Sequence, residues 1–259
     1  MSVVERAKRV AYAGLDARHG FRGVPRTVNG ETVRFPARWS RYYPSTYEPA
    51  KAAFLRRHAT PGATVLDLGA HIGLFSVHLA RAVGPSGRVV SVEPAPETAA
   101  VLRRTMRCNG VEDVVSVRQA AVWGRRGDAD LFETGDVCAN ASSLVRTGRT
   151  LGSVPVAAVT LDDLVDDEEL TVAVVKMDVE GAELEALEGA PGLLADQGPA
   201  LAVEVHPLEL RASGRDPREV FDLLARHGYV VEEAERPLAR ASFDRSGCFE
   251  IQAVRPGGR

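Results

Sequence analysis

The segment that most constrains the fold spans residues 63–93 and reads ATVLDLGAHIGLFSVHLARAVGPSGRVVSVE. An apolar strand ends at Asp67, a turn with Gly69 and Gly73 follows, and a helix leads to a second apolar strand that ends at Glu93. This order is typical of a nucleoside-binding βαβ unit. The acid also lies about 20 positions beyond the second glycine, a spacing at which a carboxylate accepts hydrogen bonds from a ribose.

The spacing of the two glycines indicates which nucleoside binds. A dinucleotide fingerprint, G-x-G-x-x-G, uses its second glycine to let the backbone approach a pyrophosphate. His71 stands at that place here, between Ala70 and Ile72. The segment therefore favours a nucleoside without phosphate, such as S-adenosylmethionine (SAM), over a nicotinamide dinucleotide or an α/β fold of another use.

Length, charge and cysteine content narrow the class of protein. The 259 residues suit one α/β domain with an extension, and the net charge of −3 disfavours a nucleic-acid partner. The three cysteines, Cys108, Cys138 and Cys248, form no C-x-x-C pair and are typical of reduced thiols. Neither a signal peptide nor a run of roughly 18 apolar residues is present, so we expect a cytoplasmic protein without an integral membrane segment. A monomer and a homodimer both remain open.

Residues 1–48 are expected to form an extension before the main domain. Apolar positions in residues 2–18 recur with a helical period, and this helix either packs on the main domain or lies on a membrane or partner. Asn29-Gly30 predicts a hairpin within residues 24–35.

A cluster of aromatic residues closes this extension. Tyr42, Tyr43 and Tyr47 lie within six residues, close to Trp39. They form either a lid that binds the substrate or an aromatic staple that holds the extension on the core.

Residues 49–259 are expected to form the SAM-binding domain. Apolar strands alternate with helices there, which predicts a doubly wound, mostly parallel seven-stranded sheet with an antiparallel C-terminal edge. Residues 121–159 lack a helical period and are rich in glycine and serine, so they are expected to be an insertion that covers one edge of the sheet.

Ligands bind at the carboxyl ends of the strands in such sheets, and those ends here carry candidate site residues. For the cofactor we expect contacts from Asp67, Gly69, Ala70, His71, Gly73, Glu93 and Asp178, with Ala120 and Ala121 near the adenine.

The run KMDVEGAE contains the most interesting acids. Asp178 and Glu180 either cap a helix that begins near Val179 or lie on the acceptor side of the transferred methyl group. In the second interpretation, Asp178 orients or deprotonates an acceptor hydroxyl, or binds a divalent ion such as Mg²⁺ together with Glu204. His206 is a candidate base, because the pKa of an imidazole lies near the working pH, but it is equally well a structural residue.

Five blocks of the sequence resemble the FkbM family of SAM-dependent methyltransferases. They run from about Tyr47 to Pro207, and they read VLDLGAHIGLFSVHLA, VVSVEPAPETAAVLRRTMRCNGV, VTLDDL, VVKMDVEGAELEALEGA and LAVEVHP. The K-x-D-V-E-G-x-E block is the specific part. The family's glycine turn usually reads G-A-N-x-G, and His71 replaces the asparagine here.

The resemblance implies a class I methyltransferase fold and methylation of a hydroxyl on a sugar, a glycolipid or a polyketide-type metabolite, in secondary metabolism or a cell-surface pathway. It implies that Asp67, Gly69 and Gly73 line the cofactor, that Glu93 holds its ribose, and that Asp178 and Glu180 stand at the acceptor side. Two alternatives remain: a carboxyl or peptide methyltransferase, and a nucleoside-binding module without catalysis.

Overall fold

The structure, a computed structural model, describes residues 3–133, 143–148 and 150–257. Cys138 and the middle of the predicted insertion lie outside the described residues. Cys108 and Cys248 are free thiols. Among the helices that the structure describes, none combines the length and the apolar character needed to traverse a bilayer.

Eight strands form the central sheet. They are β3 (Thr64–Leu68), β4 (Arg88–Val92), β5 (Val115–Arg118), β9 (Val172–Met177), β10 (Ala200–Val205), β11 (Val230–Glu233), β12 (Arg236–Pro237) and β13 (Phe249–Val254). Their order is β12-β11-β13-β10-β9-β3-β4-β5. The run from β10 to β5 is parallel, whereas β13 is antiparallel to both of its neighbours. The predicted doubly wound, mostly parallel sheet is confirmed.

One detail of the predicted sheet, the number of strands, is corrected. The eighth strand is β12, whose two residues pair with Glu232 and Glu233 of β11, and so short a strand carries no readable periodicity. The predicted antiparallel C-terminal edge is confirmed, because β13 and β11 pair antiparallel at that side of the sheet.

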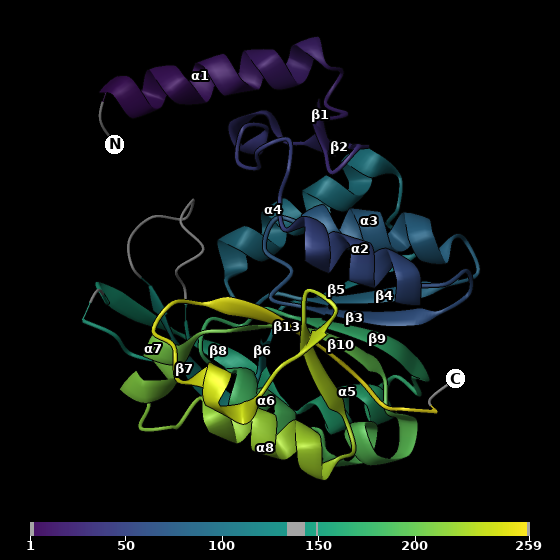
Figure 1. Cartoon of the computed structure of the whole chain (residues 1–259). Coiled ribbons are helices and arrows are strands. Elements are labelled where there is room, and N and C mark those ends of the chain that lie inside the picture. Colours follow the sequence, from purple (N-terminus) through teal and green to yellow (C-terminus); the bar gives the residue numbers. More distant parts are fainter. Residues whose placement is uncertain (1–2, 134–142, 149, 258–259) are drawn as a thin grey trace.

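Helices cover both faces of the sheet (Figure 1). The helices α2 (Pro49–His58), α3 (Leu74–Val83) and α4 (Pro96–Asn109) lie on one face, and α5 (Leu161–Asp167), α6 (Glu183–Glu188) and α8 (Arg218–Arg226) lie on the other. Shorter helical turns are α7 (Pro207–Ala212), η1 (Ala37–Trp39), η2 (Leu193–Gln197) and η3 (Arg240–Phe243).

The strands are apolar on both sides because both faces of the sheet are buried. In β3, Val65 packs into the core beneath α2 and α3, whereas Leu66 and Leu68 pack into the core on the opposite face. Their side chains alternate between the faces with the period of two that a strand imposes. The polar exception in this strand is Asp67, which is fully buried at the end where ligands bind.

The N-terminal hairpin forms as the sequence predicts. The strands β1 (Val24–Val28) and β2 (Glu31–Phe35) pair antiparallel. Asn29 and Gly30 join them with φ values of 51° and 82°, and two successive positive φ values are the requirement of a type I′ turn.

The helix α1 (Val3–Arg18) extends away from the body of the molecule (Figure 1). Val10 is 68% exposed, so the apolar stripe of this helix is not packed along its length. Its C-terminal end is held by Asp16, which accepts a hydrogen bond from the backbone N–H of Ala37 and pairs with Arg104. The two predicted roles of this helix therefore both stay predictions.

The described parts of residues 121–159 form a second, three-stranded sheet. Its strands are β6 (Ala121–Val122), β7 (Gly127–Glu133) and β8 (Gly152–Val159), in the order β6-β8-β7. Leu131, Val156 and Ala158 form a small core of its own. This segment also reaches the loop after β9, because the hydroxyl of Ser143 donates a hydrogen bond to the carbonyl oxygen of Glu180.

Candidate active site

Both glycines of the turn after β3 are required by close packing. Gly69 has a φ of 68°, and a Cβ built on it lies 1.7 Å from the carbonyl oxygen of Asp178. Gly73 has a φ of 92°, and its Cβ would lie 2.6 Å or less from side-chain atoms of Met106 and Leu102. Glycine is therefore needed for the backbone conformation at both positions, and at Gly69 also for the approach of β3 to the end of β9.

A buried lysine stabilises this turn through hydrogen bonds to its backbone. Lys176, in β9, is 3% exposed, and its Nζ donates hydrogen bonds to the carbonyl oxygens of Gly69 at 2.7 Å and Leu68 at 3.2 Å. The same Nζ lies 3.3 Å from Oδ1 of Asp67, whose Oδ2 accepts a hydrogen bond from Ser76 at 2.6 Å. The fully buried side chain of Asp67 thus organises the turn, and its contact with the cofactor stays a prediction.

Lys176 was missed by the reasoning from the sequence. The available signal was a lone lysine within the otherwise apolar strand VAVVKM. A lysine at such a position has to find oxygen partners, since burying an unpaired ammonium group is very costly.

Glu93, at the end of β4, holds the turn from its other side. Its Oε2 accepts a hydrogen bond from the backbone N–H of His71 at 3.0 Å, and its Oε1 accepts one from Ala95 at 3.0 Å. Burial raises the pKa of Glu93 to about 7, although the two backbone donors oppose that shift. Each oxygen keeps a lone pair for a further donor, which suits the two hydroxyls of a ribose.

His71 contributes a neutral imidazole to the same turn. Its Nδ1 lies 3.2 Å from the hydroxyl of Tyr43, while its Nε2 is buried without a hydrogen-bond partner. Burial and then the charge of Lys176 lower the pKa of His71 to about 4. An orphaned buried nitrogen in the glycine turn fits a site where a polar ligand atom completes the hydrogen bonding.

Two tyrosines of the extension, Tyr42 and Tyr43, pack over this histidine, and Tyr47 packs against Tyr43. The ring centroids of Tyr42 and His71 lie 4.8 Å apart, and those of Tyr43 and Tyr47 lie 4.9 Å apart. All three side chains pack against the core that contains Trp39. The staple interpretation accounts for these contacts, and binding of the substrate by the tyrosines stays a prediction.

The loop between β9 and α6 differs from the predicted helix start. The helix begins at Glu183 with Ala182 as its N-cap, so Asp178 and Glu180 are not in its first turn and the capping interpretation is wrong. Glu180 has a φ of 52° and Gly181 a φ of 97°. A non-glycine residue in the left-handed region is uncommon and indicates a loop conformation held by its surroundings.

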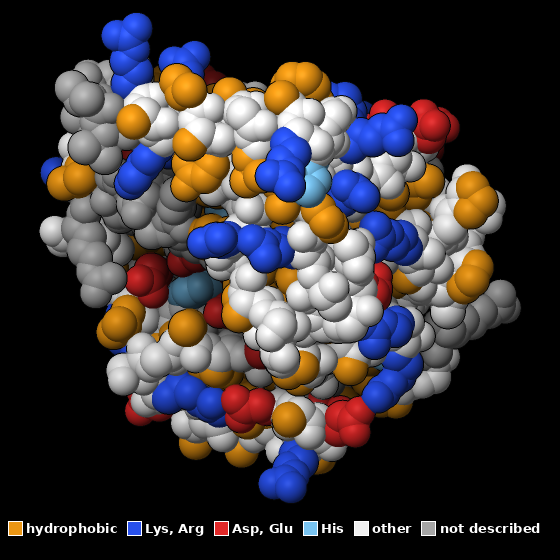
Figure 2. Space-filling model, turned by 90° about the horizontal axis from the view of Figure 1, so that it is seen from above, with side chains coloured by type: hydrophobic (Ala, Val, Ile, Leu, Met, Phe, Trp, Pro, Cys, Tyr) orange, Lys and Arg blue, Asp and Glu red, His pale blue; other side chains and the backbone are white. Residues whose placement is uncertain are grey.

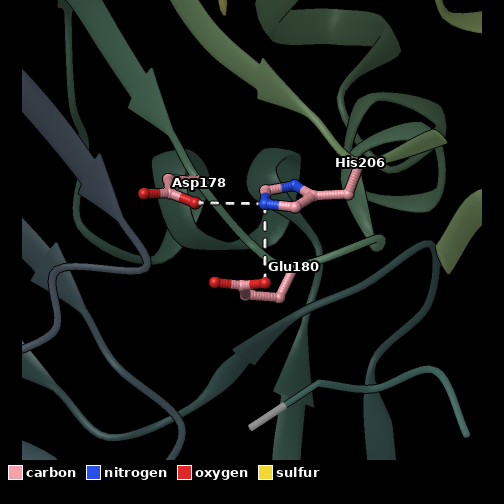
Figure 3. A group of neighbouring side chains, drawn as sticks. All are labelled: Asp178, Glu180 and His206. Atoms are coloured by element: carbon pink, nitrogen blue, oxygen red, sulfur yellow. Dashed lines mark ion pairs between the residues drawn. The ribbon is translucent and has the colours of Figure 1, made fainter. Parts of the chain in front are cut away.

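Four side chains meet at the ends of β9 and β10 and form what we call the carboxylate–imidazole cluster: Asp178, Glu180, Glu183 and His206. The Nε2 atom of His206 lies 3.4 Å from Oε2 of Glu180 and 3.9 Å from Oδ1 of Asp178 (Figure 3). Its Nδ1 lies 2.8 Å from Oε1 of Glu183. Asp178 and Glu180 remain 18% and 27% exposed, so a ligand can reach them.

The charges of this cluster differ from the sequence prediction. Burial lowers the pKa of His206, but the hydrogen bond to Glu183 and the charges of Glu183, Glu180 and Asp178 raise it to about 10. Burial also opposes ionisation of Asp178, yet the neighbouring Lys176, Lys51 and His206 outweigh it and lower the pKa of Asp178. The predicted base His206 is therefore a cation at neutral pH, and Asp178 is the ionised carboxylate beside it.

A second group of acids surrounds Lys51. Lys51 is fully buried, and its Nζ lies 2.5 Å from Oε2 of Glu48 and 2.9 Å from Oε2 of Glu204. Glu48, Asp178 and Glu204 also present oxygen atoms within 4.8 Å of one another. The sequence predicted a candidate divalent ion at Asp178 and Glu204. In the structure, the ammonium group of Lys51 provides a positive charge next to Glu204.

The small residues predicted near the cofactor are mostly buried. Ala70 is 5% exposed, and its N–H donates a hydrogen bond to the carbonyl oxygen of Val92. Ala120 and Ala121 are 7% and 2% exposed and lie just beyond β5. Contact of these two alanines with an adenine stays a prediction.

A recess gives access to charged side chains on one face of the molecule. Figure 2 views the molecule from the side of α1 and shows acidic side chains and a histidine that lie deeper than the surface around them.

Comparison with known proteins assigns the family. Residues 67–231, which include the glycine turn, Glu93 and the carboxylate–imidazole cluster, match the methyltransferase FkbM domain. The chain belongs to the FkbM methyltransferase family. The resemblance noted in the sequence is thereby confirmed, and the fold is that of a SAM-dependent methyltransferase.

Two curated relatives extend the comparison of this FkbM methyltransferase. The AMB antimetabolite synthetase AmbE of Pseudomonas aeruginosa is 27% identical over 235 residues, which cover 76% of this chain and 11% of AmbE. The hexuronic acid methyltransferase AglP of Haloferax volcanii is 31% identical over 160 residues, which cover 61% of this chain and 60% of AglP. The FkbM chain thus spans less than two thirds of either relative.

Solved structures show more distant similarity. A methyltransferase FkbM from Methylobacillus flagellatus aligns with a TM-score of 0.49 at 18% identity, over 76% of this chain and 44% of that one. An O-methyltransferase from Bacillus cereus in complex with SAH aligns with a TM-score of 0.49 at 17% identity, over 81% and 82% of the two chains.

Proposed function

We propose that this FkbM methyltransferase transfers the methyl group of SAM to a hydroxyl of a small metabolite, and that the acceptor is a sugar or a sugar-bearing molecule. When bound, SAM supplies a methyl group that is already activated as a sulfonium. The protein then has to align the acceptor, exclude water and receive one proton.

One observation carries this proposal: an ionised carboxylate lies directly beside the glycine turn. The backbone N–H of Asp178 donates a hydrogen bond to Leu68 at 3.1 Å, and Gly69 is in close contact with its carbonyl group. The side chain is partly exposed, and the neighbouring cations Lys176, Lys51 and His206 outweigh burial and lower its pKa. In the proposed reaction its carboxylate accepts the proton of the acceptor hydroxyl.

The residues around the turn fit an adenosine ligand. Glu93 offers two oxygens with spare lone pairs for the ribose, and the orphaned Nε2 of His71 offers a polar contact nearby. Both groups are buried, so these hydrogen bonds would form in a medium of low polarity where they are strong.

The sugar acceptor is proposed from the relative AglP, which is named a hexuronic acid methyltransferase. A hexuronic acid presents hydroxyls and a carboxylate, so methylation gives either an ether or an ester. The ionised carboxylate of Asp178 favours a hydroxyl acceptor, because it can accept the proton that a hydroxyl releases, whereas an acceptor carboxylate has no proton to give.

The assay that tests the proposal uses purified protein, methyl-labelled SAM and matched sugars with and without a carboxylate, namely glucuronosides and glucosides. We expect labelled product that is heavier by one CH₂ unit and resists mild alkali, as an ether does. Label that is released by alkali would instead show the ester of a carboxyl methyltransferase.

Replacing Glu93 with glutamine is expected to weaken binding of S-adenosylhomocysteine (SAH) by about 10- to 100-fold, because hydrogen bonds to a charged acceptor are lost. The amide also places a donor against one of the two backbone N–H groups, of His71 or Ala95.

The binding of SAH should also depend on pH. The carboxylate is the form that accepts from the ribose, and the pKa of Glu93 is raised to about 7, so affinity in the unmodified protein should rise as the pH is raised through this value. Calorimetry at several pH values measures both effects. Glu97→Gln, an exposed glutamate on α4, is the matched control and should bind SAH as the unmodified protein does. Equal affinity and an equal pH profile for Glu93→Gln would remove Glu93 from the site.

A further inference from the structure

Glu183 is a completely buried acid with a defined set of partners. It is the first residue of α6 and is 0% exposed. Its Oε1 accepts a hydrogen bond from the backbone N–H of Gly181 at 2.9 Å and lies 2.8 Å from Nδ1 of His206. A buried carboxylate is costly unless it is paired, and the imidazole of His206 is its partner here.

This contact determines how the imidazole faces the site. Because Glu183 accepts from Nδ1, the opposite ring nitrogen, Nε2, points to Asp178 and Glu180 (Figure 3). The ring itself is 7% exposed, so its position is set by the protein and not by solvent. The backbone of Gly181 supports the arrangement, since a Cβ there would lie 2.3 Å from Cβ of Glu209.

We propose that Glu183 is a positioning residue for methyl transfer, which keeps His206 doubly protonated with Nε2–H directed at the carboxylates of Asp178 and Glu180. The imidazolium thereby places a positive charge beside Asp178, which helps to keep that carboxylate ionised next to the acceptor hydroxyl. This inference rests on the proposed function for the role of Asp178, but the state of His206 is a property of the free protein.

The charges around His206 support this assignment. Asp178 faces it from the end of β9, Glu180 from the following loop and Glu183 from α6, and all three raise its pKa. Burial raises the pKa of Cys248, before β13, and the charge of His206 is among the causes that oppose this shift. Three acids against one imidazole favour the imidazolium, so a base at this position has to be a carboxylate.

Two variants separate the charge of Glu183 from its geometry. Glu183→Gln keeps the length of the side chain and removes the charge, whereas Glu183→Asp keeps the charge and withdraws it by one methylene group. Glu188→Gln, an exposed acid at the other end of α6, is the matched control.

The first readout is the titration of the imidazole of His206 by NMR, assigned by the signal that is lost in His206→Asn. In the unmodified protein we expect the ring to titrate near 10 and to show two N–H protons at neutral pH. In Glu183→Gln we expect its pKa to fall, because an anion that favours the charged ring is gone. The Glu188→Gln profile should not move.

The second readout is turnover of the acceptor. We expect kcat to fall about 10- to 100-fold in both Glu183 variants, because His206 and Asp178 would be misplaced relative to the acceptor. The KM for SAM should stay unchanged. On the alkaline side of the pH–activity profile, Glu183→Gln should lose its activity at a lower pH than the unmodified protein does.

The outcomes decide the two proposals separately. An imidazole of His206 that titrates near its ordinary value in the unmodified protein overturns this inference, even if both variants fail to fold. A raised value that Glu183→Gln leaves unchanged also overturns it. A raised value that falls in Glu183→Gln, in a protein that methylates nothing, supports the positioning by Glu183 and refutes the proposed function.

Discussion

Replacing Asp178 with asparagine is expected to lower kcat by about 10²- to 10⁴-fold, the range that a positioned general base contributes. The amide has nearly the same shape but accepts no proton at neutral pH. The binding of SAH should change far less than kcat, because the ribose contacts of Glu93 are untouched. The proposed role of the carboxylate thus predicts a loss in the chemical step and not in cofactor affinity.

The measurement is single-turnover methyl transfer to the acceptor found in the labelled-SAM assay, with SAH affinity determined in parallel. Asp128→Asn, an exposed aspartate on β7, is the control and should react at the unmodified rate. If Asp178→Asn retained full kcat, the carboxylate would have no part in removing the proton.

The second large effect is expected on stability. Replacing Lys176 with methionine should lower the free energy of unfolding by about 3–5 kcal/mol, the cost of leaving one member of a buried ion pair without its partner. Asp67 would keep only the hydroxyl of Ser76 as a donor, and the carbonyl groups of Leu68 and Gly69 would lose theirs.

Urea unfolding followed by circular dichroism measures this change. Lys8→Met removes an exposed lysine from α1 and should leave the unfolding midpoint in place. The double variant Lys176→Met with Asp67→Asn should recover part of the loss, because the unpaired charge is then gone. If Lys176→Met lowered the free energy of unfolding by less than about 1 kcal/mol, which is the contribution of an exposed ion pair, Lys176 would not stabilise the turn.

The parts of the fold that the sequence predicted correctly depend on neighbours along the chain. The glycine turn, the hairpin at Asn29-Gly30 and the alternation of strands and helices each arise from local rules of backbone conformation and apolar periodicity. The order of the strands, which local patterns leave open, comes from the structure.

The parts that it did not predict depend on contacts between distant segments. Lys51 meets Glu204 across 153 positions, and Lys176 meets Leu68 across 108. Nothing local in α2 or β9 indicates those partners. The pKa of His206 is likewise set by acids on other elements, so the isolated motif VEVHP suggested a base where the folded protein has a cation.

The central claim is that the turn after β3 and the carboxylate of Glu93 bind an adenosine ligand without a pyrophosphate. Calorimetric titration of the purified protein with SAH, and separately with NAD, tests it most directly. We predict saturable binding of SAH at one site and no measurable heat from NAD. Tight binding of NAD together with indifference to SAH would contradict the account.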